Sequence, residues 1–125
     1  MGDTIVWTDI PVKNIERASA FYSAIIGAAV MPMPGADTEV GLLTSPDRQG
    51  GVSADLYVGG TPSKQGATVY LNTWGDIDGM LARVTEAGGT VLQEKQFMGD
   101  MVGWIAFIED TEGNRIGLQQ PADGK

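Results

Sequence analysis

Two aspartates, Asp9 and Asp55, are the main candidates for chemistry in this sequence, because it contains neither His nor Cys. The missing imidazole and thiol exclude a Ser-His-Asp triad, a thiolate nucleophile and zinc–sulfur ligation. A carboxylate can still orient a polar or cationic ligand, or act as a base whose pKa is raised by burial. The alternative is that both carboxylates are solvated on edge strands.

Aromatic and amide side chains accompany these carboxylates. Trp7 offers a flat face and an N–H donor to an aromatic or cationic ligand, or it packs between two halves of the core. Tyr70 and Asn72 alternate with apolar residues, so both are expected on one polar face of a strand. There they hydrogen-bond a ligand or complete a network between strands.

The elements that must position these residues begin with a strand and a helix. Thr4–Ile10 is rich in β-branched and aromatic residues, which predicts a strand. Apolar residues then recur at helical spacing from Ile15, with Asn14 as the N-cap and Gly27 where a C-terminal glycine is expected. The sequence therefore predicts a strand followed by a capped helix.

The same pattern returns about sixty residues later. A strand is predicted over Ala67–Trp74, and Asp76 caps a second helix that ends at Gly88-Gly89. The helices superpose at an offset of 62 residues and the strands at 61, with one extra residue near Trp74-Gly75. This self-similarity indicates an internal duplication.

Three strand-like segments follow each predicted helix, so each half has the order βαβββ. The length and the 42% hydrophobic content fit one α+β domain over residues 1–125, with module one at about 4–58, a linker at 59–66 and module two at about 67–120. The six segments are Ala28–Met33, Glu39–Thr44, Val52–Val58, Thr90–Glu94, Val102–Glu109 and Asn114–Gln119.

Two such curved sheets are expected to enclose a cleft between the modules. Alternation places one set of strand residues against the helices and the other set toward a ligand. The expected core residues are Val6, Ile10, Val69, Leu71, Ile116 and Leu118, and the expected cleft residues are Trp7, Asp9, Asp55, Tyr70, Asn72, Arg115, Gly117 and Gln119.

A further segment, residues 94–103, combines apolar side chains with two glycines and has two interpretations. It forms a lid over the cleft, or it makes a dimer contact. Trp104 is assigned to the same surface and is a candidate ligand-binding residue.

Charge restricts the partners. Sixteen acidic residues against eight basic ones give a net charge of −8, which repels nucleic acids and anionic membranes. No apolar run reaches ~18 residues and no basic region opens the chain, so neither a membrane span nor a secretory signal is expected. We therefore expect a cytoplasmic protein with no nucleic-acid or membrane partner.

Several motifs along nearly the whole chain resemble one known superfamily, the vicinal oxygen chelate proteins. This group contains glyoxalases, bleomycin-resistance proteins, fosfomycin-resistance enzymes and extradiol dioxygenases, and the resemblance implies their fold of paired βαβββ modules. The motifs are Ile10-Pro11-Val12, Glu16-Arg17-Ala18, Phe21-Tyr22 with Gly27, Val69-Tyr70-Leu71-Asn72, Asp76-Ile77-Asp78 and the segment from Asp110 to Leu118.

The resemblance also implies four positions for metal ligands, on the first and last strand of each module. They fall on Trp7, on Thr68 or Val69, on Asp55 and on Gly117. Only Asp55 is an acceptable ligand, whereas such a site needs at least three. We therefore expect no metal or other cofactor, with a weakly held divalent ion such as Mg²⁺ as the alternative.

The functional expectation is metal-independent binding of a small molecule, with cationic or aromatic character, in the cleft between the modules. The alternative is a divalent-metal-dependent lyase or dioxygenase of the glyoxalase type, and a third possibility is a partner module with a vestigial cleft. Catalytic residues are not assigned. The resemblance and the exposed sheet edges together predict a homodimer.

Overall fold

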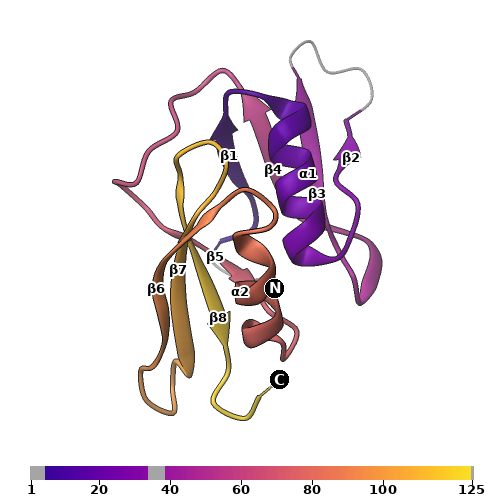
Figure 1. Ribbon diagram of the computed structural model, residues 1–125. Coiled ribbons are helices and arrows are strands. Elements are labelled where there is room, and N and C mark those ends of the chain that lie inside the picture. The colour runs from indigo at the N-terminus through magenta and orange to yellow at the C-terminus, as the bar shows by residue number, and fades with distance from the viewer. Residues whose placement is uncertain (1–4, 34–38, 125) are drawn as a thin grey trace.

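The computed structural model of the protein describes residues 5–33 and 39–124, arranged as two modules of one helix and four strands each (Figure 1). Module one consists of β1 (Thr8–Val12), α1 (Ile15–Ile26), β2 (Met31–Pro32), β3 (Val40–Ser45) and β4 (Arg48–Val58). Module two consists of β5 (Val69–Asn72), α2 (Ile77–Val84), β6 (Thr90–Phe97), β7 (Trp104–Glu109) and β8 (Arg115–Gln120).

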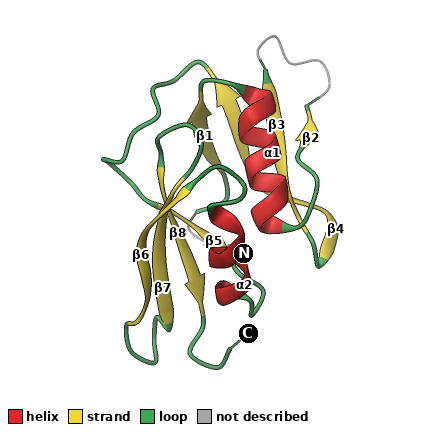
Figure 2. Ribbon diagram, in the orientation of Figure 1, coloured by secondary structure: helices red, strands yellow, loops and turns green. Residues whose placement is uncertain are grey.

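The two modules have the same sheet topology, which confirms the α+β fold of paired βαβββ units (Figure 2). The strand order is β1-β4-β3-β2 in the first sheet and β5-β8-β7-β6 in the second. In each sheet the first and last strands of the module pair in parallel and the other pairs are antiparallel. The first strand of each module is therefore an edge strand.

The helix ends follow the predicted capping residues, with one exception. The Asn14 side chain accepts a hydrogen bond from the Arg17 backbone N–H at 2.9 Å, and Gly27 ends α1 with φ at +85°. Asp76 caps α2 through the Gly79 N–H at 3.2 Å. The predicted end at Gly88-Gly89 is too late, because α2 stops at Val84 and the chain continues in turns.

Several strand boundaries differ from the predictions. The first strand covers Thr8–Val12 rather than Thr4–Ile10, and it includes Pro11. An edge strand tolerates proline, because one side of its backbone has no strand to which an N–H could be donated. Similarly β5 is shorter than Ala67–Trp74, whereas β4 begins at Arg48 and β6 continues to Phe97.

One hydrophobic core lies between the sheets and the helices. The prediction that Val6 is a core residue is wrong, because Val6 precedes β1 and exposes 72% of its surface. Val69 is only partly buried. Of the other expected core residues, Ile10, Leu71, Ile116 and Leu118 are buried, together with Phe21, Tyr22, Ile25, Leu56, Met80 and Ile108.

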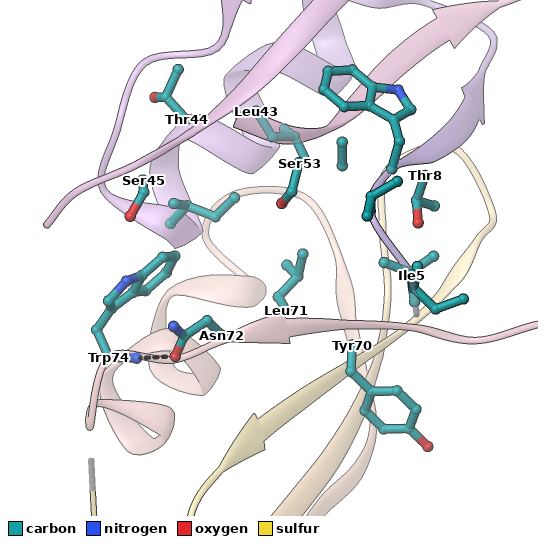
Figure 3. A pocket seen from close by; sticks show the side chains of 15 residues that line it. Ile5, Thr8, Leu43, Thr44, Ser45, Ser53, Tyr70, Leu71, Asn72 and Trp74 are labelled. Atoms are coloured by element: carbon teal, nitrogen blue, oxygen red, sulfur yellow. Dashed lines mark hydrogen bonds between the residues drawn. The ribbon is translucent and has the colours of Figure 1, made fainter. Parts of the chain in front are cut away.

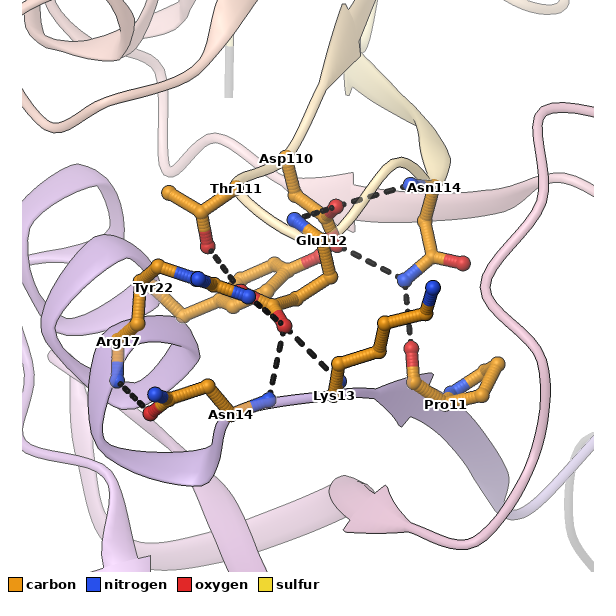
Figure 4. Close-up of polar contacts among 9 residues, drawn as sticks. All are labelled: Pro11, Lys13, Asn14, Arg17, Tyr22, Asp110, Thr111, Glu112 and Asn114. Carbon is orange, nitrogen blue, oxygen red and sulfur yellow. Dashed lines mark hydrogen bonds and ion pairs between the residues drawn. The ribbon is translucent and has the colours of Figure 1, made fainter.

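A polar network joins α1 to the turn between β7 and β8 (Figure 4). Glu112 accepts hydrogen bonds from the backbone N–H groups of Lys13 and Asn14 and from the guanidinium of Arg17, at 2.7 to 2.9 Å. Burial would raise the pKa of Glu112, but these donors, together with the Thr111 hydroxyl, lower it to about 2. The carboxylate is thus held ionised where the modules meet.

A second buried contact lies beside it. The Tyr22 hydroxyl donates to Oδ2 of Asp110 at 2.6 Å, and burial together with this carboxyl raises the pKa of Tyr22 well above its ordinary value. Asp110 also accepts from the backbone N–H groups of Glu112 and Asn114 and from the Asn114 amide. These bonds fix the motif from Asp110 to Asn114 against the first module.

The helix-side faces of the two sheets are turned toward each other. Helices α1 and α2 contact one another, and the Arg83 guanidinium donates to the Ile25 carbonyl at 3.0 Å. Leu43 and Ala54 of the first sheet line the same pocket as Leu71 of the second, and all three lie on the helix sides. Because side chains alternate along a strand, the opposite faces of both sheets are turned outward. We call each of these an open face.

Among the described residues, no helix has the length and apolar character needed to cross a membrane.

Candidate functional site

The open face of module one carries a cluster formed by Trp7, Asp9 and Asp55. Asp9 in β1 lies directly beside Asp55 in β4, because these two residues are partners in the parallel register. The Trp7 indole N–H donates to Oδ1 of Asp9 at 3.2 Å and to Oδ2 of Asp55 at 3.4 Å. Three of the predicted site residues are thus brought together.

Asp55 is the buried member of this cluster. It exposes 9% of its surface, and its Oδ1 atom is buried with no hydrogen-bond partner. Burial first, and then the neighbouring Asp9 carboxyl, raise the pKa of Asp55, while the Trp7 N–H opposes the shift. Asp9 is exposed. The two carboxyl groups therefore have different surroundings although they are adjacent.

The open face of module two has an aromatic residue at the equivalent place. Tyr70 in β5 lies beside Gly117 in β8, as Asp9 lies beside Asp55. These pairs are separated by 61 and 62 residues, the offsets of the internal repeat. A Cβ atom on Gly117 would lie 2.3 Å from Cδ2 of Tyr70, so the tyrosine ring occupies the place of a side chain there.

The register shows which residues lie beside the expected positions Asp55 and Gly117. The residue beside Asp55 is Asp9 rather than Trp7, and the residue beside Gly117 is Tyr70 rather than Thr68 or Val69. Trp7 lies directly before β1 and Thr68 directly before β5.

The residues paired across these strands do not fit a catalytic metal. They provide two carboxylates from one module, and a phenol over a glycine from the other. No group of three or more His, Cys, Asp or Glu residues that could hold a metal ion occurs in the described part of the chain. A divalent ion at a catalytic site ordinarily has at least three protein ligands.

A pocket of about 340 Å³ lies between the modules (Figure 3). Trp7, Tyr70 and Asn72 are among its lining residues. Figure 3 shows that Leu71 points into this space, whereas the Tyr70 ring points away from it, toward the open face. Asn72 uses its Oδ1 atom to accept a hydrogen bond from the Trp74 backbone N–H at 2.9 Å. The pocket therefore has a mixed lining of polar and apolar side chains and lies between the two modules.

Arg115 and Asp9 line a second pocket, of about 200 Å³, beside the linker. The Arg115 guanidinium lies over the Phe107 ring at 5.0 Å and donates to the Thr68 hydroxyl. Phe107 in turn contacts the Tyr70 ring, with centroids 5.9 Å apart. The open face of module two thus presents Tyr70, Phe107 and Arg115 as one contiguous group.

Trp104, the remaining predicted site residue, lies elsewhere. It packs against the core from the helix side of β7 and contacts the Phe97 ring at 5.1 Å and the Lys95 ammonium at 4.9 Å. Its neighbours form a hairpin closed by a hydrogen bond from the Met98 N–H to the Gly103 carbonyl at 2.7 Å. Whether this hairpin is a lid or a dimer contact stays a prediction.

Sequence reasoning missed two residues of these surfaces. Phe107 completes the contiguous group on module two, and the alternation of Ile105 and Phe107 with buried residues of β7 is the pattern that could have revealed it. Trp74 lines the pocket between the modules, and its backbone φ of +50° is uncommon for a residue with a side chain. In the sequence, this place is marked by the one extra residue near Trp74-Gly75 that separates the two repeat offsets.

The two paired βαβββ modules form the fold of the glyoxalase/bleomycin-resistance proteins. The family model of the Glyoxalase/Bleomycin resistance protein/Dioxygenase superfamily matches residues 4–118. The chain belongs to this superfamily. A glyoxylase-like domain-containing protein from Didymella fabae is 28% identical over 109 residues, which are 85% of this chain and 84% of the relative.

Solved structures agree with this assignment. A glyoxylase/bleomycin resistance protein/dioxygenase domain from Frankia has a TM-score of 0.70 at 18% identity, with 100% of this chain and 96% of that chain covered. TnmS3, an antibiotic-binding protein from Streptomyces, has a TM-score of 0.64 at 25% identity, with 97% and 98% covered. A fosfomycin resistance protein from Listeria monocytogenes, solved with Mn(II), has a TM-score of 0.67 at 14% identity, with 95% and 90% covered.

Proposed function

We propose that this protein binds a small molecule with aromatic or cationic character, without the help of a metal ion or other cofactor. The observation that carries the proposal is the composition of the four equivalent strand positions. Asp9 and Asp55 on one module are matched by Tyr70 and Gly117 on the other. This set offers hydrogen-bonding and stacking groups but too few metal ligands.

A solved relative supports binding over catalysis. TnmS3, at 25% identity with nearly complete coverage of both chains, is described as an antibiotic-binding protein. Such a function needs no catalytic base, which agrees with a sequence that contains no His and no Cys.

We propose further that two copies of the chain form the complete cleft. Residues of both open faces line the two pockets between the modules of one chain, but Asp55 lines neither of these pockets. Trp7 and Tyr70 expose 44% and 46% of their surfaces on these faces, which is a large aromatic area to leave in water. In a homodimer, module one of one protomer would face module two of its partner.

Oligomeric state is measured by light scattering after size-exclusion chromatography. The expected mass is twice the 13.2 kDa of one chain. Tyr70→Glu, which places a charge on the open face, should shift the protein toward the monomer, whereas the control change Glu86→Gln, at an exposed residue in the turn after α2, should not. A monomeric wild-type protein at high concentration contradicts the two-copy cleft.

Metal independence is tested on protein treated with EDTA. Metal content is measured by elemental analysis, and ligand binding by thermal shift against a chemically diverse set of aromatic and cationic compounds, because a bound ligand raises the unfolding temperature. The expected result is binding without stoichiometric metal. Stoichiometric metal, or EDTA-sensitive turnover of the methylglyoxal–glutathione hemithioacetal, would instead establish the lyase alternative.

A further inference from the structure

The pocket of about 200 Å³ beside the linker is lined by one acidic and one basic side chain, Asp9 and Arg115. The other described residues that line it are uncharged. The pocket lies within one chain, and Asp55 does not line it, so it is separate from a cleft formed by two copies. Its two opposite charges therefore need an explanation of their own.

The linker forms one wall of this pocket and is tied to the start of β8. The Ser63 backbone N–H donates to Oδ1 of Asn114 at 3.0 Å, and the Arg115 backbone N–H donates to the Ser63 carbonyl at 3.3 Å. The Gln65 backbone N–H donates to the Ser63 hydroxyl at 2.9 Å. Hydrogen bonds thus hold this wall in place beside the side chain of Arg115.

The guanidinium of Arg115 has a fixed direction but no anionic partner. It lies over the Phe107 ring at 5.0 Å and donates to the Thr68 hydroxyl. Among the described residues, no carboxylate forms an ion pair with it. A guanidinium presents several N–H donors in a rigid fork that matches a carboxylate. Arg115 is therefore suited to bind the carboxylate of a ligand.

Asp9 is the negative counterpart on the other module. Its Oδ1 atom accepts a hydrogen bond from the Trp7 indole at 3.2 Å, which orients the carboxylate. Within the described parts of the chain, Asp9 forms no ion pair, either with Arg115 or with another residue. The two opposite charges thus line one pocket without neutralising each other through direct contact.

Apolar side chains line the same pocket and limit what fits there. They belong to Pro11, Ala67, Val69 and Ile116, among others. The volume of about 200 Å³ is below the roughly 300 Å³ at which pockets for drug-sized ligands begin. Apolar surroundings also strengthen the attraction between a ligand charge and a protein charge. The pocket therefore suits a small molecule with an aliphatic part.

We propose that this pocket binds the zwitterion of a small aliphatic α-amino acid, with its carboxylate on Arg115 and its ammonium group on Asp9. Charge balance decides the ligand class. A ligand with only a positive charge leaves Arg115 without a partner, and a ligand with only a negative charge leaves Asp9 without one. The inference goes beyond the proposed function, because it concerns a second site that one chain forms alone.

Isothermal titration calorimetry with L-valine as the probe tests this inference. Isobutylammonium is L-valine without its carboxylate, and 3-methylbutanoate is L-valine without its amino group. All three probes have the same branched side chain, so their affinities separate the two charges. We expect L-valine to bind, and each probe with a single charge to bind at least tenfold more weakly.

Two variants assign each charge to its residue. Arg115→Gln should weaken L-valine by about tenfold or more, equivalent to ~1.4 kcal/mol, without weakening isobutylammonium. Asp9→Asn should weaken L-valine similarly without weakening 3-methylbutanoate. Lys13→Gln and Asp78→Asn, at exposed residues outside the pocket, are the charge-matched controls. Thermal unfolding shows whether each variant is folded, and the three probes on the wild-type protein decide the question if one is not.

Nuclear magnetic resonance locates the site. On addition of L-valine, the backbone amide resonances of Thr61, Ser63 and Gln65 should shift, because these residues line the pocket. Those of α2, which does not line it, should stay in place. Shifts confined to other parts of the chain would place the amino acid elsewhere and overturn the inference.

Three further results would also overturn it. The first is no binding of L-alanine, L-valine or L-leucine at millimolar concentration. The second is equal binding of L-valine and either probe with a single charge, which removes recognition of the zwitterion. The third is L-valine binding that Arg115→Gln leaves unchanged. The proposed function is decided separately, because hits among aromatic compounds in the thermal-shift set support it whether or not an amino acid binds.

Discussion

The ring of Tyr70 lies over the α-carbon of Gly117 and fills the space that a side chain at residue 117 would take. A methyl group there would come within 2.3 Å of the ring, closer than any unstrained contact. Residue 117 therefore cannot gain a side chain unless the Tyr70 ring moves.

Gly117→Ala should therefore force the Tyr70 ring aside. The ring is half-exposed and flexible, so the expected loss in unfolding free energy is only about 1 kcal/mol. Urea denaturation of Gly117→Ala, Tyr70→Ala and the double variant measures the coupling between them. The loss should disappear in the Tyr70→Ala background, and additive effects would show that the ring does not occupy this space.

Glu112 should make the protein sensitive to acid. Its pKa is lowered to about 2 in the folded state, below the ordinary value of 4.5. The folded state is therefore stabilised fully above about pH 4.5, and this contribution is lost as the pH falls from 4.5 toward 2. A shift of this size is worth about 3 kcal/mol.

Glu112→Gln should lower the free energy of unfolding at pH 7 by about that amount and flatten its dependence on pH between 4.5 and 2. Urea unfolding at several pH values measures this. Glu86→Gln, at an exposed residue, serves as the control. If the free energy of unfolding of Glu112→Gln still falls between pH 4.5 and 2 as steeply as that of the wild-type protein, other carboxylates cause the acid sensitivity.

Tyr22→Phe should destabilise the fold by about 1–2 kcal/mol, because it removes a buried hydrogen bond to a carboxylate. Asp110 keeps its donors from Glu112 and Asn114, so it is not left without partners. Thermal unfolding should show a shift of several degrees with an unchanged far-ultraviolet spectrum. A neutral effect would mean that the remaining donors satisfy Asp110 completely.

Asp55→Asn should raise the free energy of unfolding at neutral pH, whereas Glu112→Gln and Tyr22→Phe should lower it. The pKa of Asp55 is raised in the folded state, so its ionisation opposes folding once the pH exceeds the ordinary value. The expected gain is about 1 kcal/mol above the raised pKa, and it should shrink as the pH falls toward the ordinary value. A destabilised variant at neutral pH would show that the carboxylate serves the fold rather than a ligand.

The sequence allowed much of the fold to be predicted, because the deciding interactions are local. Asn14, Gly27 and Asp76 determine helix ends within a few residues of the chain, and the repeat offsets of 61 and 62 residues hold in the observed register. The start of β1 was predicted too early, since the apolar Val6 continues the alternating pattern although no neighbouring strand pairs with it.

The site was predicted less completely, because it depends on packing between distant residues. Alternation correctly placed Asp9, Asp55 and Tyr70 opposite the core-facing residues of their strands. The orientation of the two open faces depends instead on how α1 packs against α2, and no local pattern in either helix specifies it. The ring of Tyr70 over Gly117 is likewise a contact between strands that the sequence does not reveal. The cytoplasmic location stays a prediction.

The outward orientation of the open faces has a consequence for a dimer made of two chains that carry different substitutions, one in each module. In a dimer whose clefts each combine the first module of one protomer with the second module of the other, a chain carrying Asp55→Asn and a chain carrying Tyr70→Ala would complement each other. A mixed dimer would contain one cleft with both substitutions and one with neither. When the two inactive chains are co-expressed, each mixed dimer should therefore contain one intact cleft out of two. Ligand binding would then reappear by intragenic complementation, although neither chain binds the ligand by itself.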